Sequence, residues 1–521
     1  MRALLVLFAG CLQDEAFEPV LNGKNSLSLA VEQGKKFPSV EKTVIFASKG
    51  DFSFLQGVQI EQRDLWTKRA LLERIAALQT GFNLVYFAFA DCPFLDPALA
   101  GAIAERHLRY AAEYSYADGW PFGLAPETLS PGTAGILSNI LGDDGPVERD
   151  ILFSVIQKDI NAFDIEAEIS PEDLRCHRIN LCADSKRNLL LLENFLAASG
   201  GGIPSADGVR RIVEQQPEIL RTLPAFYPIQ VSGGCPQKCV FCPYPSNADA
   251  AESAGFMDSE KFESLLDKIT AFSGDAVIDL SLWGELSLHP EKMKLIEAVL
   301  SRDALSLVIE TSGLGWRNEE LEKCATLSAA LSNAAARKNR IAPLSWIVSL
   351  DTANPQRYAE LRGQGFAEAE ACAKKLLSLF PNDCYVQAVR MAGSEEDTEK
   401  FYRYWKENAP NGEKNIIIQK YDDFCGTLEK KQASDISPLI RQSCRHIMRD
   451  MPVLIDGRVP LCRENLAALK KQRGEENMLG NVFTSALENI WQNGEKYYLE
   501  QCKKNYTGIC ADCDEYYTYN F

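Results

Sequence analysis

Short apolar runs alternate with amphipathic stretches along most of the chain. In the first 200 residues the runs ALLVLF, TVIFAS and LVYFAFA have the length of buried strands, and PALAGAIAERHLRYAAEY has a helical period. Alternation of the two kinds predicts an α/β domain over residues 1–200. The glycine-rich segment SGGGIPSADG follows, and it predicts a linker that we place at 201–224.

A second alternating series begins near residue 225. Its six candidate strands are YPIQVS, AVIDLSLW, LSLVIET, LSWIVSLD, CYVQAVRM and NIIIQKY. Amphipathic helices such as 259–272 and 368–380 lie between them. Strands joined through helices form parallel sheets, and a complete barrel of this kind needs eight strands. The pattern therefore predicts a partial (β/α)6 barrel over 225–435, followed by a small cysteine-bearing domain over 436–521.

Composition narrows the classes of function. The chain has 521 residues, of which 46% are hydrophobic and 24% charged, as in soluble globular proteins. Its net charge is −17 and no region has a basic surplus, which argues against a nucleic-acid partner. The start MRALLVLFAGC resembles a lipoprotein signal, but its apolar run is short for one, so a buried first strand is favoured. Since no apolar run reaches the roughly 18 residues of a membrane span, we expect a cytoplasmic protein with no membrane partner.

Three cysteines are crowded onto one loop after the first candidate strand of the second series. Cys235, Cys239 and Cys242 have the spacing C-x3-C-x2-C within QVSGGCPQKCVFCPYP. In a chain of this length the clustering indicates metal ligation rather than disulfides. Structural zinc requires four ligands, whereas three thiolates suit a [4Fe–4S] cube with one open iron. Zinc with a fourth ligand from elsewhere is the alternative.

This loop resembles the hallmark of the radical S-adenosylmethionine (SAM) superfamily, including the aromatic residue Phe241 before the third cysteine. The resemblance implies that the open iron chelates SAM and that an electron passed through the cluster cleaves SAM to methionine and a 5′-deoxyadenosyl radical. It also implies an electron donor such as a flavodoxin or ferredoxin. The segment LWGELSLHP is similar to the family's GGEPLLHP motif, although Trp283 and Leu286 depart from it. Gly284 and Glu285 match the motif, so Glu285 is implied to bond the amino group of SAM.

Two further segments extend the resemblance. The third strand ends in ETSG, where Thr311 and Ser312 are candidates for contacts with SAM. The stretch SLDTANPQRYAELRG is similar to the family's "SLD … yaelRg". On that match Ser349 or Asp351 contacts the ribose and Arg362 meets the SAM carboxylate. Strand-end turns and an ordinary helix cap are the competing explanation for these residues.

A second group of cysteines lies near the C-terminus, at Cys444, Cys462, Cys510 and Cys513. Their order, C … G-x4-C … C-x2-C, resembles the SPASM domain and its shortened twitch form, which are appended to radical SAM barrels. A full SPASM domain has seven cysteines, so we expect one auxiliary [4Fe–4S] cluster on these four, with tetrahedral zinc as the alternative. Cysteines without such spacing, including Cys425, are expected to be small buried apolar residues.

The segment YFAFADCPFLDPAL resembles the "gDaPfl" motif of cytidylyltransferase-type nucleotidyltransferases, in which the aspartate matching Asp91 binds a metal at the nucleotide phosphates. The segment LNGKNSL, with Gly23 and Lys24, is faintly similar to their substrate loop. However, the glycine- and arginine-rich nucleotide loop is absent after the first strand, where the chain reads FAGCLQDEAFEP. Without amides and cations to hold a triphosphate, we expect a nucleotidyltransferase-like domain that has lost catalysis and serves in docking.

The three-part arrangement resembles the spiro-SPASM protein family. It implies a radical SAM enzyme, and a peptide or protein side chain is the expected substrate because SPASM-bearing relatives commonly modify peptides. Radical chemistry on a sugar- or nucleotide-linked molecule, presented by the N-terminal domain, is one alternative, and a non-catalytic metal-binding scaffold is another.

The segment QKYDDFCG ends the sixth candidate strand and predicts catalytic groups at the barrel mouth. It carries Tyr421, Asp422 and Asp423, and the carboxyl ends of barrel strands face the active site. A substrate that has lost a hydrogen atom must often lose a proton too, and a carboxylate here is placed to accept it. A solvated Asp-Asp turn is the competing explanation.

Overall fold

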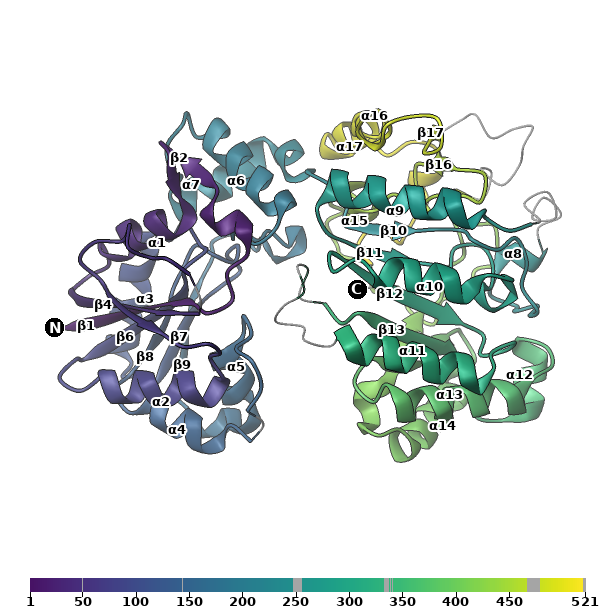
Figure 1. Ribbon diagram of the computed structural model, residues 1–521, viewed down its shortest axis with the longest axis horizontal. Coiled ribbons are helices and arrows are strands. Elements are labelled where there is room, and N and C mark those ends of the chain that lie inside the picture. The colour runs from purple at the N-terminus through teal and green to yellow at the C-terminus, as the bar shows by residue number, and fades with distance from the viewer. Residues whose placement is uncertain are drawn as a thin grey trace. The chain divides into compact units, whose positions relative to one another are not determined.

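The computed structural model describes residues 1–48, 50–142, 144–246, 255–331, 337, 339, 341–465 and 478–518. The chain divides into two compact units, residues 1–222 and 223–521 (Figure 1). Each unit has its own hydrophobic core. Among the helices of the described residues, none combines the length and apolarity that crossing a bilayer requires.

The N-terminal unit contains a seven-stranded mixed sheet in the order β5-β4-β1-β6-β8-β7-β9. Its strands are β1 (Ala3–Ala9), β4 (Val40–Ala47), β5 (Gln59–Gln62), β6 (Leu84–Phe89), β7 (Tyr114–Asp118), β8 (Glu127–Leu129) and β9 (Ile165–Ile169). The strand β1 is buried along its whole length and runs parallel to β4 and β6, whereas β8 is antiparallel to β6 and β7. The predicted α/β class of this region is therefore confirmed, and the apolar start of the chain is an interior strand of the sheet, between β4 and β6.

Among the described residues of this unit, seven α-helices connect or flank the strands. They are α1 (Ser26–Gly34), α2 (Lys68–Leu78), α3 (Pro97–Arg109), α4 (Thr133–Ile140), α5 (Ile151–Ile156), α6 (Lys186–Ala198) and α7 (Ala206–Gln215). The helix α7 lies in the range predicted to be a linker. The Ser205 side chain caps α7 by accepting a hydrogen bond from the Gly208 amide, and Val209 and Val213 are buried beneath it. Its amphipathic face thus joins the folded unit, and only the glycines before it form a connection.

The C-terminal unit contains a six-stranded sheet in which every neighbouring pair is parallel. Its strands, in spatial and chain order, are β10 (Phe226–Pro228), β11 (Ala276–Asp279), β12 (Leu305–Thr311), β13 (Leu344–Ser349), β14 (Cys384–Arg390) and β15 (Ile416–Lys420). The six predicted strands are confirmed in this order. Because the sheet stops at six strands, it forms an open half-barrel.

Helices follow the strands of this sheet, and several of them stand before it in Figure 1. They are α8 (Pro243–Ser246), α9 (Ser259–Ser273), α10 (Lys292–Leu300), α11 (Asn318–Leu331), α12 (Pro355–Leu361), α13 (Phe366–Leu379) and α14 (Glu395–Asn408). Alternate strand residues such as Tyr227, Ile278 and Trp346 join the large core with these helices. Their neighbours Phe226, Val277 and Ile347 form a smaller apolar cluster on the opposite face. This period of two leaves one face of the sheet free to build a site.

The end of the chain packs onto the first strand of the half-barrel. Its elements are α15 (Arg445–Arg449), β16 (Arg458–Pro460), β17 (Met478–Asn481), α16 (Leu487–Asn493) and α17 (Glu495–Cys502). The Val453 amide donates to the Pro228 carbonyl at 2.8 Å, and the Gln230 amide donates to the Val453 carbonyl at 2.8 Å. This segment therefore pairs with β10 through isolated bridges, without forming a seventh strand, and carries the C-terminal cysteines to the half-barrel.

Candidate functional site

A cavity of about 260 Å³ opens at the carboxyl end of the half-barrel strands. Beyond the apolar cluster, the same strand faces present the polar residues Asp279, Glu310, Ser349, Gln387 and Gln419, which line this cavity. Glu310 accepts hydrogen bonds from Ser349 Oγ at 2.9 Å and from Gln387 Nε2 at 2.7 Å. Four of the five polar residues were not predicted from the sequence. The sequence pattern could have identified them, because each of these residues lies two positions after an apolar residue on the same face of its strand.

The three-cysteine loop forms one end of the cavity. Cys235, Cys239 and Cys242 all line it, together with Phe241. The loop is fixed to the end of α12, since the Lys238 amide donates to the Arg362 carbonyl and the Val240 amide to the Leu361 carbonyl, each at 2.9 Å. The structure therefore brings the predicted ligands and the predicted aromatic residue to one wall.

Glu285 lies beside this loop and is almost fully buried. Its carboxylate accepts hydrogen bonds from Thr311 Oγ1 at 2.7 Å and from the Ser312 amide at 2.8 Å. Its own amide donates to the Gly234 carbonyl at 2.8 Å. The predicted residues Glu285, Thr311 and Ser312 thus form one connected group that faces the cavity.

Gly284 is required by the close approach of two backbone segments. A Cβ atom at this position would lie 1.9 Å from the carbonyl oxygen of Ser232, a distance that no side chain tolerates. The neighbouring Trp283 has a left-handed φ of 49°, and its carbonyl accepts a hydrogen bond from Gln230 Nε2 at 3.0 Å. The match of Gly284 to the motif therefore has a physical cause, which is the contact between the strand end and the cysteine loop.

Arg362 forms a buried ion pair with Asp351, with 2.5 Å between Nη1 and Oδ2. Burial alone would lower the pKa of Arg362, but Cys239 and Asp351 nearby raise it overall, so the guanidinium stays charged. Its Nε is buried without a hydrogen-bond partner, and its Cζ lies 5.6 Å from the centre of the Phe241 ring. Arg362 lines the cavity, whereas Asp351 does not. Besides its ion pair with Arg362, Asp351 accepts a hydrogen bond from the Val389 amide at 2.7 Å.

The opposite end of the cavity follows β14 and β15. Asp422 lines it, next to Lys420 and Arg463. Burial, together with the nearby carboxyl groups of Glu464 and Glu515, raises the pKa of Asp422 to about 9. The carboxyl group therefore holds its proton at neutral pH in this environment.

Tyr421 and Asp423 do not line the cavity, although the sequence analysis grouped them with Asp422. The Tyr421 hydroxyl donates to the Glu429 carbonyl at 2.7 Å. Asp423 accepts from the Gly426 amide at 2.9 Å and from Gln432 Nε2 at 3.2 Å. Both side chains hold the turn that follows β15, so only one of the three predicted catalytic residues faces the cavity.

A second cavity, in the C-terminal part of the same unit, is lined by five cysteines. These are the four predicted ligands Cys444, Cys462, Cys510 and Cys513, and also Cys425. The expectation that Cys425 is only a small apolar residue is incomplete, because the loop after β15 carries it to the other four. The position of Cys425 in the sequence does not indicate that it lies beside the other four cysteines. His446 lines the same cavity, with Nδ1 2.6 Å from Asp450 Oδ2 and a buried, unpartnered Nε2.

A hydrogen bond distinguishes Cys513 within this group, because its sulfur accepts from the Glu515 amide at 3.4 Å. The neighbouring Cys425 and the Glu515 amide lower the pKa of Cys513, whereas Cys513 and burial raise the pKa of Cys425.

The spacing of the thiols bears on the two kinds of metal centre that the sequence left open, a zinc ion and an iron–sulfur cluster. Four sulfurs bound to one zinc ion at 2.3 Å lie about 3.8 Å apart. No three of the eight cysteines that line the two cavities, all of them in the described part of the chain, lie within 4.8 Å of one another. In this structure these thiols therefore do not form the compact group of three or more that a single metal ion would hold. Burial raises the pKa of Cys235 and Cys242 to about 12, so binding a cluster must release their protons.

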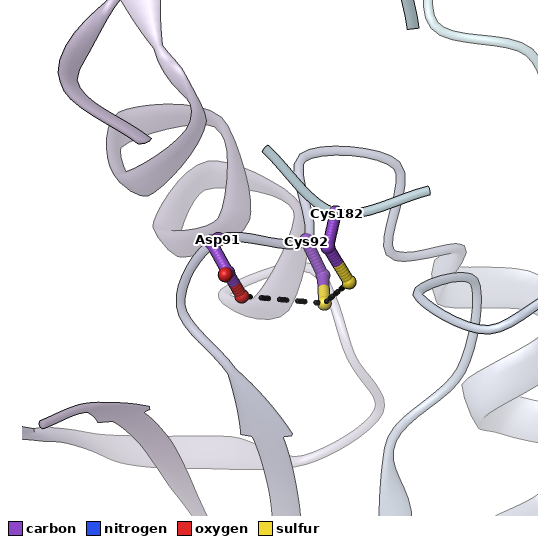
Figure 2. A group of neighbouring side chains, drawn as sticks. All are labelled: Asp91, Cys92 and Cys182. Atoms are coloured by element: carbon purple, nitrogen blue, oxygen red, sulfur yellow. Dashed lines mark hydrogen bonds between the residues drawn. The ribbon is translucent and has the colours of Figure 1, made fainter. Parts of the chain in front are cut away.

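The aspartate that resembles a nucleotidyltransferase metal ligand is already paired in the N-terminal unit. Arg149 donates two hydrogen bonds to the Asp91 carboxylate, at 2.7 and 2.6 Å, and a third to Asp184 Oδ2 at 3.0 Å. The neighbouring thiols of Cys92 and Cys182 lie 3.3 Å apart, and Figure 2 shows them beside the Asp91 carboxylate. Arg149 therefore occupies both carboxylate oxygens of Asp91 in this structure, while ligand atoms of Asp91, Cys92 and Cys182 all lie within 4.8 Å of one another.

Two family models match the chain. The model of the radical SAM superfamily matches residues 229–404, and that of the SPASM iron–sulfur cluster-binding domain matches residues 444–514. An uncharacterized protein of Treponema pallidum (strain Nichols) is 34% identical over 380 residues, which cover 71% of this chain and 98% of the relative. A second protein of that organism, also uncharacterized, is 39% identical over 59 residues, 11% of this chain and 27% of its own length.

Several solved structures overlap with parts of the chain. Streptococcus suis SuiB bound to the precursor peptide SuiA has 15% identity and a TM-score of 0.40, covering 66% of this chain and 78% of SuiB. Native anSMEcpe with bound AdoMet has 16% identity and a TM-score of 0.39, covering 56% and 87%. A cytidylyltransferase from Leptospira borgpetersenii serovar Hardjo-bovis (strain JB197) has 14% identity and a TM-score of 0.36, covering 42% of this chain and 97% of its own.

Proposed function

Because the chain belongs to the radical SAM superfamily and carries a SPASM iron–sulfur cluster-binding domain, we propose that it modifies a side chain of a peptide or protein. It is an enzyme that uses [4Fe–4S] clusters and SAM. When bound, the cluster of the first cavity supplies the electron that cleaves SAM to methionine and a 5′-deoxyadenosyl radical. We propose as its ligands Cys235, Cys239 and Cys242, and as ligands of one auxiliary cluster Cys444, Cys462, Cys510 and Cys513.

The residues next to the three-cysteine loop bind and orient SAM in this proposal. Glu285 is the acceptor for the SAM amino group, and its contacts with Thr311 and Ser312 hold its carboxylate in one orientation. Arg362 is the donor for the SAM carboxylate, since it lines the cavity and its Nε is buried without a partner. A group bound there would satisfy a buried donor, which is otherwise costly to leave unpaired. Ser349 remains the candidate for the ribose, because it lines the same cavity and Asp351 does not.

The observation that carries the substrate class is the chemistry of the other end of the cavity. The side-chain amides of Gln387 and Gln419 line it and can donate to and accept from peptide groups. Its two cations are already paired: Lys420 Nζ lies 2.7 Å from Asp514 Oδ2, and Arg463 Nε lies 3.0 Å from Glu464 Oε1. Recognition of a phosphate relies on such cations being available, so this end favours a peptide over a nucleotide-linked sugar.

Asp422 is the group that receives or supplies the proton of the substrate. It is the predicted carboxylate that lines the cavity, and its raised pKa places its basic form above about pH 9. The expected substrate conversion therefore rises as the pH approaches that value. As the sequence predicts, we further propose a cytoplasmic enzyme whose electrons come from a flavodoxin or ferredoxin.

Deuterium transfer from substrate to 5′-deoxyadenosine tests the substrate class directly. The reconstituted protein would be incubated with SAM, a reductant and either a perdeuterated peptide pool or a perdeuterated extract of sugar nucleotides. We expect mass spectrometry to find deuterated 5′-deoxyadenosine with the peptide pool alone. Deuterium from the sugar nucleotides alone would replace the proposal with its alternative. If reduction produced no 5′-deoxyadenosine from SAM in either mixture, the chain would be a non-catalytic scaffold.

A further inference from the structure

Arg441 is the only Arg or Lys among the described residues that line the second cavity. The two carboxylates that line the same cavity are paired with other cations. Glu464 Oε1 lies 3.0 Å from Arg463 Nε, and Glu515 forms an ion pair with Lys420. The positive charge of Arg441 is therefore not neutralised by the carboxylates of this cavity.

Two aromatic rings and two carbonyl groups hold the Arg441 side chain in place. Its Cζ lies 4.0 Å from the centre of the Tyr506 ring and 4.6 Å from that of the Tyr516 ring. Its Nη2 donates to the Cys510 carbonyl at 2.6 Å, and its Nη1 donates to the Ala511 carbonyl at 3.2 Å. Arginine stacks on aromatic faces and donates through a planar fork, whereas lysine is a compact point charge. The guanidinium is thus fixed against the backbone of the loop that carries the proposed ligand Cys510.

One nitrogen of this guanidinium remains without a partner. Arg441 Nε is buried, and no described group accepts a hydrogen bond from it. An unpaired buried donor is costly, particularly in a charged group. A [4Fe–4S] cluster held by four thiolates bears net negative charge, and its presence in the cavity would reduce this cost. The charge and the free donor of Arg441 therefore fit such a group.

We propose that the guanidinium of Arg441 acts on the auxiliary cluster as a fixed positive charge and so raises its reduction potential. This inference rests on the proposed function, because it requires a cluster on the C-terminal cysteines. Reduction by one electron adds negative charge to the cluster, and a neighbouring cation stabilises the reduced form more than the oxidised form. Arg441 is therefore a positioning residue, which binds no iron itself.

Redox titration of the auxiliary cluster alone tests the inference. The full-length variant Cys235→Ala/Cys239→Ala/Cys242→Ala, reconstituted without oxygen, lacks the signal of the first cluster and serves as the parent. Adding Arg441→Gln should leave the iron content unchanged and lower the midpoint potential measured by electron paramagnetic resonance. Loss of a charged donor should change the ratio of reduced to oxidised cluster about tenfold, or about 59 mV for one electron.

Two comparison variants keep the test specific. Arg441→Lys retains the charge without the planar fork, and its midpoint should stay close to that of the parent. Arg458→Gln removes an arginine of the same part of the chain that pairs with Asp456 and does not line the cavity, so it should change neither potential nor iron.

An unchanged midpoint in Arg441→Gln would overturn the inference, and so would an equal fall in Arg441→Lys, because the charge would then not be the cause. Iron loss in Arg441→Gln would overturn it as well, since Arg441 would then be required for the site to form. If the parent bound no iron, the proposed auxiliary cluster itself would be wrong, and the inference would fall with it.

Discussion

Replacing Gly284 by alanine tests whether the contact between the cysteine loop and the strand end builds the active site. The added Cβ would lie 1.9 Å from the Ser232 carbonyl oxygen, whereas real Cβ atoms essentially never approach within 3.0 Å. The two segments must therefore separate by at least about 1.1 Å, the difference between these two distances. That movement breaks the hydrogen bond from the Glu285 amide to the Gly234 carbonyl and the one from Gln230 to Trp283.

The cost can be worked from these contacts. Two lost hydrogen bonds amount to about 2 kcal/mol, and forcing a methyl group into a packed site adds about 1–3 kcal/mol. We expect Gly284→Ala to lower the free energy of unfolding of the cluster-free protein by about 3–5 kcal/mol. Because Glu285 moves with its neighbour, the variant should also lose SAM binding.

Urea unfolding of the cluster-free protein, and SAM binding after reconstitution, measure the two effects. Gly234→Ala is a matched control in the same loop, because its Cβ would meet only Leu288 Cδ1, at an ordinary 3.5 Å. In cluster-free protein it should cost less than about 1 kcal/mol. Equal stability of Gly284→Ala and Gly234→Ala, with SAM binding retained in the former, would refute the reasoning.

Three further predictions concern single groups. Burial raises the pKa of Glu127 from 4.5 to about 7, so its contribution to stability is complete below pH 4.5 and lost as the pH rises through 7. At pH 8 the free energy of unfolding of Glu127→Gln, measured in urea, should therefore exceed that of the parent by up to about 3 kcal/mol. A smaller gain at pH 8 than at pH 5 would contradict this. Asp422→Asn should leave the cleavage of SAM intact but reduce substrate conversion by roughly 10²-fold and remove the rise of conversion toward pH 9. An unaltered pH profile would mean that Asp422 has only a structural role in the turn. Changing Cys510 and Cys513 together to alanine should preserve SAM binding in a folded protein, and loss of that binding would mean that the open iron has been assigned to the wrong cluster.

The half-barrel was predictable from the sequence because each of its strands is a dense apolar run and each crossover is an amphipathic helix. The loop cysteines and Glu285 were predictable from the sequence for a related reason, since they follow the ends of such strands. The place of Cys425 beside the C-terminal cysteines could not be predicted, because it depends on the contact between the turn after β15 and the end of the chain. The spacing of cysteines in the sequence does not indicate that contact. The same holds for Arg149, which pairs with Asp91 from 58 residues away in the chain. Tyr421 and Asp423 adjoin Asp422 in sequence, but hydrogen bonds within the turn direct them away from the cavity.

The iron content of anaerobically reconstituted protein tests the central claim most directly. Two [4Fe–4S] clusters, one on the three-cysteine loop and one on the C-terminal cysteines, require about eight irons per chain, and Cys239→Ala should retain about four of them. Metal analysis that found about eight irons in the parent and about four in Cys239→Ala would agree with the account. Stoichiometric zinc at both sites, with no iron lost in the variant, would contradict it.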